Sequence, residues 1–107
     1  MEYARSVNGA AIRLTSERWV HIVENHDDLA GKFYDVLEGI TDPDVVLRGA
    51  TDECLAVRRG KPFDLVVVYR ETSSTDGFVI TAFQTSKSKQ LIGTRKTIWC
   101  KQKSKRF

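Results

Sequence analysis

The spacing of the apolar residues changes at Pro43, and this change constrains the fold more than any other feature of the sequence. Before Pro43, apolar side chains recur at intervals of three and four residues, which is the spacing of one face of a helix. After Pro43, short segments rich in β-branched residues follow a period of two, which is typical of strands. Two helices followed by a run of strands joined through short loops predict an α+β domain with an antiparallel sheet.

Two helices are predicted before Pro43. The first begins at Thr15, whose hydroxyl can cap free backbone amides, and Glu17 in its first turn favours the helix dipole. The second begins at Asp27-Asp28 and ends within residues 39–42, because the proline blocks its continuation. The apolar stripes of the two helices consist of Trp19, Ile22, Val23 and His26, and of Leu29, Phe33, Val36, Leu37 and Ile40.

Five strands are predicted after Pro43, at residues 44–48, 54–59, 63–70, 78–85 and 94–100. The segment from Leu65 to Tyr69 is apolar throughout, as expected of a central strand with both faces covered. The whole chain, residues 1–107, is predicted to form a single domain, because 107 residues are too few to build two hydrophobic cores of adequate size.

The charge of the chain is divided unevenly along its length. The net charge is only +3, but residues 86–107 contain eight Lys and Arg and no acidic residue. All 14 acidic residues lie in residues 1–85, together with nine basic ones. A basic end on an acidic body indicates contact with a polyanion, or a solubilising tail.

Several classes of protein are excluded by missing signals. No apolar run approaches the length of a membrane helix, and the first residues lack the apolar stretch of a signal peptide, so a cytoplasmic protein is expected. Cys54 and Cys100 form no CxxC motif; two reduced thiols are expected, with one disulfide as the alternative. Nucleotide, dinucleotide, zincin and hydrolase motifs are missing, and no cofactor is expected.

The two histidines are candidates for proton transfer. His26 ends the apolar stripe of the first helix, where it is either a general acid or base at the edge of a cleft or a half-buried histidine hydrogen-bonded at the helix end. His21 projects about 200° from Trp19 on the same helix, so an ordinary solvated side chain is favoured there. The two histidines therefore cannot hold one metal ion on a regular helix, and no metal site is expected.

Arg58 and Thr81 are the other candidate site residues. Arg58 and Arg59 are adjacent on a strand and face opposite sides, so one of them can bind phosphate together with Lys61, unless these charges only protect an edge strand. Alternation places Thr81 on the same face as Val79, Phe83 and Thr85. Its hydroxyl either points into a functional site or forms a hydrogen bond with a backbone group.

The basic end of the chain carries the residues expected of a nucleic-acid contact. Lys87 and Lys89 suit phosphate contacts, and Trp99 or Phe107 can stack on an unpaired base. The alternative is a final strand anchored by Ile98 and Trp99, followed by a solvated basic tail at about residues 101–107.

A set of short motifs runs along residues 12–100: Ile12-Arg13-Leu14-Thr15, Glu17-Arg18-Trp19, His21-Ile22, His26-Asp27-Asp28, Asp42-Pro43, Ala56-Val57-Arg58, Asp76-Gly77-Phe78-Val79 and Thr81-Ala82-Phe83. In this order the motifs resemble a family of small bacterial and phage-associated proteins assigned to the barnase/EndoU/colicin/RelE-like (BECR) nuclease fold. Relatives commonly have His-Pro-acid where this chain has His26-Asp27-Asp28.

The resemblance implies one or two N-terminal helices packed on a curved antiparallel sheet of about four to five strands. It also implies a toxin-like, metal-independent endoribonuclease, with a protein of the antitoxin type as a possible partner. The matching catalytic positions are His21 or His26, Arg58 and Thr81, and Lys61, Lys87 and Lys89 guide the RNA.

The expected reaction is attack by an RNA 2′-hydroxyl on the neighbouring phosphorus of a single strand. This step needs a base, an acid and positive donors, which we expect from His26 and Arg58, with Thr81 as a positioning group. The alternative is a non-catalytic RNA- or protein-binding module of the same fold.

Overall fold

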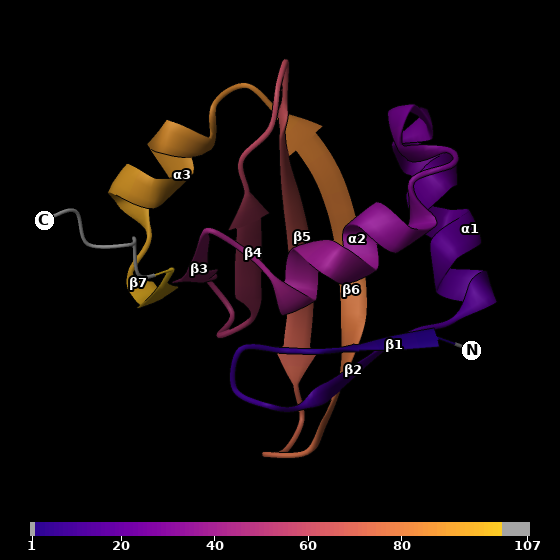
Figure 1. The fold of residues 1–107 in the computed structure, drawn as a ribbon, viewed down its shortest axis with the longest axis horizontal. Helices are drawn as coiled ribbons and strands as arrows, with labels where there is room; N and C mark the ends of the chain where they lie inside the picture. Colours follow the sequence, from indigo (N-terminus) through magenta and orange to yellow (C-terminus); the bar gives the residue numbers. More distant parts are fainter. Residues whose placement is uncertain (1, 102–107) are drawn as a thin grey trace, which may run out of the picture.

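The computed structural model describes residues 2–101 and has an α+β fold (Figure 1). No helix in this range is long and apolar enough to cross a membrane. The elements, in chain order, are β1 (Glu2–Arg5), β2 (Ala11–Leu14), α1 (Ser16–Asn25), the 3-10 helix η1 (Asp27–Leu29), α2 (Phe33–Thr41), β3 (Val45–Arg48), β4 (Cys54–Arg58), β5 (Asp64–Glu71), β6 (Asp76–Thr85), α3 (Ser88–Thr94) and β7 (Thr97–Cys100).

All seven strands form one sheet, in the order β1-β2-β6-β5-β4-β3-β7. The strands from β3 to β6 pair antiparallel with their neighbours in sequence, whereas β2 pairs parallel with β6. The sheet is therefore mixed, and the expectation of a purely antiparallel sheet with four to five strands was wrong. The predicted strands correspond to β3–β7. The hairpin of β1 and β2 was not predicted from the sequence.

The helix count was also wrong, because a third helix lies in the C-terminal half. Helix α3 occupies residues 88–94, and its end at Thr94 falls where a strand was expected to begin. Before Pro43 the second predicted helix is divided into η1 and α2. Gly31 lies between them with a φ of 83°, a left-handed conformation that a helix cannot contain.

Helix α1 begins and ends as the sequence predicts. Thr15 is its N-cap, and the Thr15 hydroxyl accepts a hydrogen bond from the Arg18 amide at 3.1 Å. His26 is its C-cap, and its amide donates to the Ile22 carbonyl at 2.8 Å.

The two faces of the sheet carry separate hydrophobic clusters. Helices α1, η1 and α2 pack on the first face through buried residues such as Ile22, Leu29 and Val36. Leu91 and Ile92 of α3 pack on the second face, against side chains of β3, β4 and β5. The central position of β5 in the strand order confirms the prediction drawn from its apolar run.

A β-bulge in β6 changes which side chains share a face. Tyr69 of β5 pairs with Val79, but the preceding residue Val68 pairs with Thr81, so Ile80 is the additional residue. Val79 therefore packs in the first cluster with Tyr69, while Thr81 lies on the second face with Val68. The expectation that Val79 and Thr81 share a face was wrong, because it assumed unbroken alternation.

We predict opposite effects for two glycine-to-alanine substitutions. A Cβ at Gly77 would overlap the Arg70 carbonyl oxygen and lie 2.7 Å from Ile12 Cδ1. Gly77→Ala should therefore lower the free energy of unfolding by about 1–3 kcal/mol. Nothing lies within 4 Å of a Cβ at Gly93 in α3, so Gly93→Ala should raise it by about 0.5–1 kcal/mol. Urea unfolding followed by circular dichroism measures both; equal effects would contradict the packing of β6 between β2 and β5.

Candidate functional site

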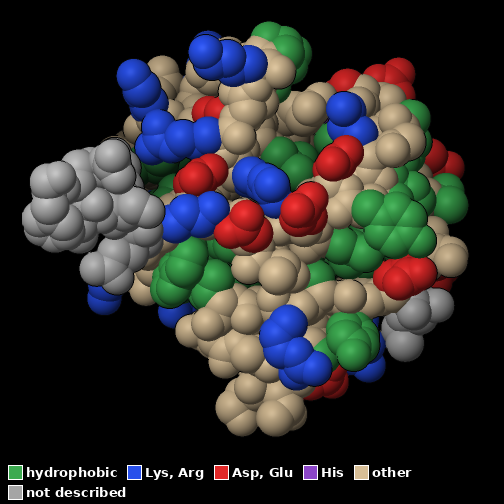
Figure 2. Space-filling model, in the orientation of Figure 1, with side chains coloured by type: hydrophobic (Ala, Val, Ile, Leu, Met, Phe, Trp, Pro, Cys, Tyr) green, Lys and Arg blue, Asp and Glu red, His purple; other side chains and the backbone are tan. Residues whose placement is uncertain are grey.

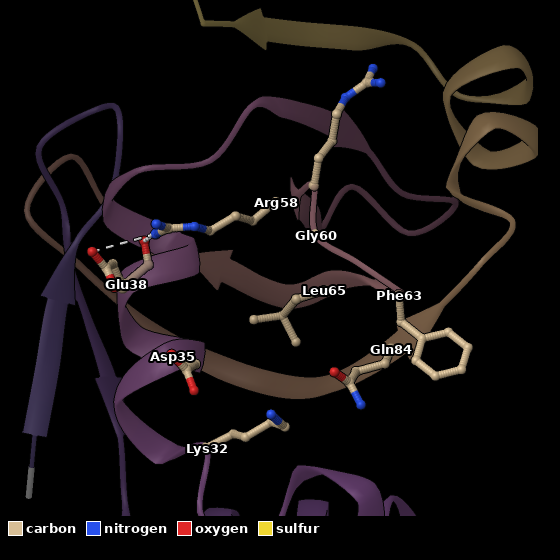
Figure 3. Close-up of a pocket in the computed structure, with 9 residues that line it drawn as sticks. Lys32, Asp35, Glu38, Arg58, Gly60, Phe63, Leu65 and Gln84 are labelled. Carbon is tan, nitrogen blue, oxygen red and sulfur yellow. Dashed lines mark hydrogen bonds and ion pairs between the residues drawn. The ribbon is translucent and has the colours of Figure 1, made fainter.

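An open pocket of about 220 Å³ lies between α2 and one end of the sheet (Figure 3). We call it the α2 pocket. The antiparallel order brings the end of β4, the start of β5 and the end of β6 to this end. Its lining consists of Lys32, Asp35 and Glu38 from the α2 segment, Arg58, Arg59, Gly60 and Phe63 from the end of β4 and the following loop, Leu65 from β5, and Gln84 from β6.

Helix α2 places three charged side chains along the pocket. Lys32, Asp35 and Glu38 are spaced by three residues, so they lie on one side of the helix, whereas Val36 and Ile40 on another side are buried in the core. The pocket wall from α2 thus combines one cation with two carboxylates.

Arg58 faces α2 across the pocket. It pairs in register with Leu65, which packs against the first cluster, so its side chain lies on the α2 side of the sheet. Its Nη1 lies 3.4 Å from the Glu38 carbonyl oxygen, to which it donates a hydrogen bond, and 3.6 Å from Glu38 Oε2. The side chain is 34% exposed, and within residues 2–101 its other guanidinium donors have no hydrogen-bond partner. A planar guanidinium held in this way retains donors for a phosphate.

Two aspartates fix the loop that carries Arg59 and Gly60. Asp44 Oδ2 accepts a hydrogen bond from the Arg59 amide at 2.7 Å, and Asp64 Oδ1 accepts one from the Gly60 amide at 2.9 Å. Asp64 also accepts a short hydrogen bond from the buried Ser88 hydroxyl. Burial acts to raise the pKa of Asp64, but the hydrogen bonds from Ser88 and Gly60 outweigh it and hold the pKa below its ordinary value.

His26 does not line the α2 pocket. Its ring centroid is 6.2 Å from that of Phe83, whose side chain packs in the second cluster, on the face of the sheet opposite α2. Asp28, two residues after His26, accepts a hydrogen bond from Gln84 Nε2 at 2.7 Å. His21 is exposed on α1, where its Nδ1 lies 3.7 Å from Glu24 Oε1.

The structure does not bring Arg58 and Thr81 together. Thr81 pairs with Val68 on the second face of the sheet, and Arg58 lies on the first face. Of the four candidate catalytic residues, only Arg58 lines the pocket. His26 is two residues from Asp28, whose carboxylate accepts the hydrogen bond from the pocket residue Gln84.

The candidate RNA-binding residues are distributed over three regions. Lys61 is exposed in the loop between β4 and β5, close in sequence to the pocket residues Gly60 and Phe63. Lys87 and Lys89 are exposed at the start of α3, where Figure 2 shows a gathering of Lys and Arg side chains. Trp99 of β7 is half-buried against the first cluster, so packing already occupies its ring. Phe107 and the basic tail from residue 102 lie outside the described residues.

Four residues that line the α2 pocket were not predicted from the sequence: Lys32, Asp35, Glu38 and Gln84. The spacing of the first three was a usable signal, since it marks a charged stripe opposite the apolar stripe of the same helix. Gln84 had no such signal. Within residues 2–101, no cluster of three or more His, Cys, Asp or Glu side chains is placed to hold a metal ion, and both cysteines are free.

No family model, curated protein or solved structure matches the chain. The BECR resemblance is therefore still a prediction from the motifs.

The pKa of Asp64 leads to a prediction about pH. A carboxyl whose pKa is lowered on folding stabilises the protein above its ordinary pKa of 3.8, and this contribution is lost as the pH falls through the folded-state value. Ser88→Ala removes a hydrogen bond to the ionised form and should cost about 1 kcal/mol at pH 7, and this cost should decrease as the pH falls below 3.8. The matched control is Ser86→Ala on an exposed residue. Chemical unfolding from pH 7 to pH 2 measures both, and a cost of Ser88→Ala that does not change with pH would contradict the prediction.

Proposed function

We propose that the chain binds single-stranded RNA in the α2 pocket and cleaves it by attack of a 2′-hydroxyl on the adjacent phosphorus, without a metal ion. One observation carries the proposal: the guanidinium of Arg58 lies beside the Glu38 carboxylate in an open pocket that also contains Lys32. Cations and a carboxylate at one position are what this reaction requires.

Phosphate binding is supported by the cations of the pocket. Arg58 lies on one side and Lys32 on the other, so a phosphate between them meets donors from two directions (Figure 3). Phe63, exposed at the rim, offers a ring on which a base can stack. Because the pocket is open, a single strand with accessible bases is a better ligand than a duplex.

Proton transfer is assigned to two groups. The Glu38 carboxylate takes the proton of the 2′-hydroxyl, whose oxygen then attacks phosphorus. The bond from phosphorus to the 5′-oxygen breaks, and His26 gives its proton to that oxygen. The products are a 2′,3′-cyclic phosphate and a free 5′-hydroxyl, and Arg58 stabilises the negative charge of the phosphorane between them. Thr81 has no part in this assignment, since it lies on the other face.

The first test uses a short labelled single-stranded RNA in the presence of EDTA. We expect 2′,3′-cyclic phosphate ends from the RNA and no cleavage of a 2′-O-methyl oligomer of the same sequence. Arg58→Gln should lower the cleavage rate by about 100- to 1000-fold, because it removes the donor for the phosphorane. Arg5→Gln changes an exposed arginine of β1 far from the pocket in the strand order and should leave the rate unchanged. Cleavage that survives in Arg58→Gln would refute the assignment.

The second test separates the two histidines of the first helix segment. His26→Ala should lower the rate by about 100-fold or more, because the leaving oxygen loses its acid. His21→Ala, at an exposed position on the same helix, should retain the rate of the unmodified protein. Thermal unfolding of both variants checks that the loss is not a loss of fold. Equal rates in the two variants would remove His26 from the mechanism.

A second candidate function is RNA binding without cleavage. It is supported by the separation of Arg58 and Thr81 on opposite faces, which leaves the predicted set of catalytic residues incomplete. Intact RNA bound by the protein, with affinity lowered in Arg58→Gln, would favour this candidate over the nuclease.

A further inference from the structure

Two arginines flank an exposed phenylalanine on the second face of the sheet. Arg13 of β2, Phe78 of β6 and Arg70 of β5 are partners in the registers of three adjacent strands. Partners in register project to the same side of a sheet, so the three side chains form one row. We call it the Phe78 row. It lies on the face opposite α2, and thus opposite the α2 pocket.

The orientation of the row follows from burial. Ile12 and Leu14, on either side of Arg13, are fully buried in the first cluster, as are Tyr69 before Arg70 and Val79 after Phe78. The row must therefore face the other way. Arg13 is 44% exposed at its side chain and Phe78 is 38% exposed, so solvent reaches the ring and a guanidinium beside it.

A third cation borders the same ring. A hollow of about 250 Å³ is lined by Arg13, Thr15, Arg18 and Phe78, together with Val79. Arg18 lies in the first turn of α1, and within residues 2–101 its side chain has no ion pair or hydrogen bond. The ring of Phe78 is thus adjacent to a hollow with two guanidinium groups.

The arginines of the row are held in place by different partners. Arg13 Nη2 lies 3.1 Å from Asp76 Oδ2, and its Nε donates to the Gly77 carbonyl at 3.4 Å. Arg70 Nη1 donates to the Thr51 carbonyl at 3.0 Å. Within residues 2–101, Arg13 is the only one of these three arginines in an ion pair with a carboxylate, so Arg18 and Arg70 have charge that an anionic ligand can neutralise.

We propose that the Phe78 row and Arg18 form a second contact for single-stranded RNA, with a base stacked on Phe78 and phosphates bound by Arg13, Arg18 and Arg70. An exposed ring between cations offers a stacking surface and charge at the same place, which is how proteins bind single strands without reading their sequence. An acidic protein segment would pair with the arginines, but it has no nucleobase that could stack on the Phe78 ring. The inference rests on the proposed function for the class of ligand only, since the row shares no residue with the α2 pocket.

The test is equilibrium binding of a fluorescent 2′-O-methyl oligomer, which cannot be cleaved, measured by anisotropy. Phe78→Ala should raise the Kd by roughly 5- to 150-fold through the loss of stacking, and Phe78→Trp should restore binding. Tyr34→Ala is the matched control, because Tyr34 is an aromatic residue of α2 that is 68% exposed and lies outside both surfaces. An unchanged Kd in Phe78→Ala would overturn the inference.

A charge variant keeps the test valid if Phe78→Ala unfolds. Arg18→Gln alters an exposed side chain and should weaken binding and reduce the slope of log K against log salt by about 0.7. Lys96→Gln, at an exposed residue next to β7 at the opposite edge of the sheet, should leave the slope unchanged. Equal slopes for the Arg18 and Lys96 variants would overturn the inference.

The outcomes also separate this inference from the proposed function. Binding weakened by Arg58→Gln but by neither Phe78→Ala nor Arg18→Gln would refute the second contact and leave the α2 pocket. Binding weakened by Phe78→Ala, in a protein that leaves RNA intact, would support the second contact and refute the nuclease. A polyglutamate peptide that binds as tightly as RNA, with the same dependence on Phe78, would assign the row to an acidic protein and overturn the inference.

Discussion

The pairing of β5 with β6 is the constraint on which the rest of the structure depends. β5 lies at the centre of the sheet, and its apolar side chains fill both hydrophobic clusters. The single additional residue Ile80 shifts β6 against β5, which decides the face on which each later side chain lies. Gln84 consequently reaches the α2 pocket, and Thr81 faces away from it. The shift of β6 by one residue thus determines which of its side chains line the candidate site.

The α2 pocket is formed by loops and strand ends rather than by a cleft between domains. Its shape depends on the hydrogen bonds that Asp44 and Asp64 accept from the loop after β4. Ser88 extends this network to the first turn of α3, so the basic second half of the chain is connected to the pocket through a carboxylate. The basic C-terminal region therefore begins with a helix that is anchored by an acidic residue of the central strand.

Local features of the sequence predicted much of the fold. The cap at Thr15, the end of helical spacing before Pro43 and the apolar run of β5 each depend on local chemistry, and the structure confirms all three. The hairpin of β1 and β2 could not be predicted in this way, because its parallel pairing with β6 is a tertiary contact. The candidate site was less predictable still. Arg58 was found from its charge and strand position. Its register partners lead to Gln84, three residues after Thr81, so Thr81 lies on the other face, and the sequence alone does not show this register of β6 with β5.

The parallel pairing of β2 with β6 also affects how the chain reaches its final form. Arg13 and Phe78 are 65 positions apart, so β2 meets β6 only after the helices and strands between them have been synthesised. Until then β2 has only β1 beside it, and an isolated two-stranded hairpin is marginally stable in water. The same pairing brings Arg13 to the ring of Phe78, so this part of the surface exists only after β6 has joined the sheet.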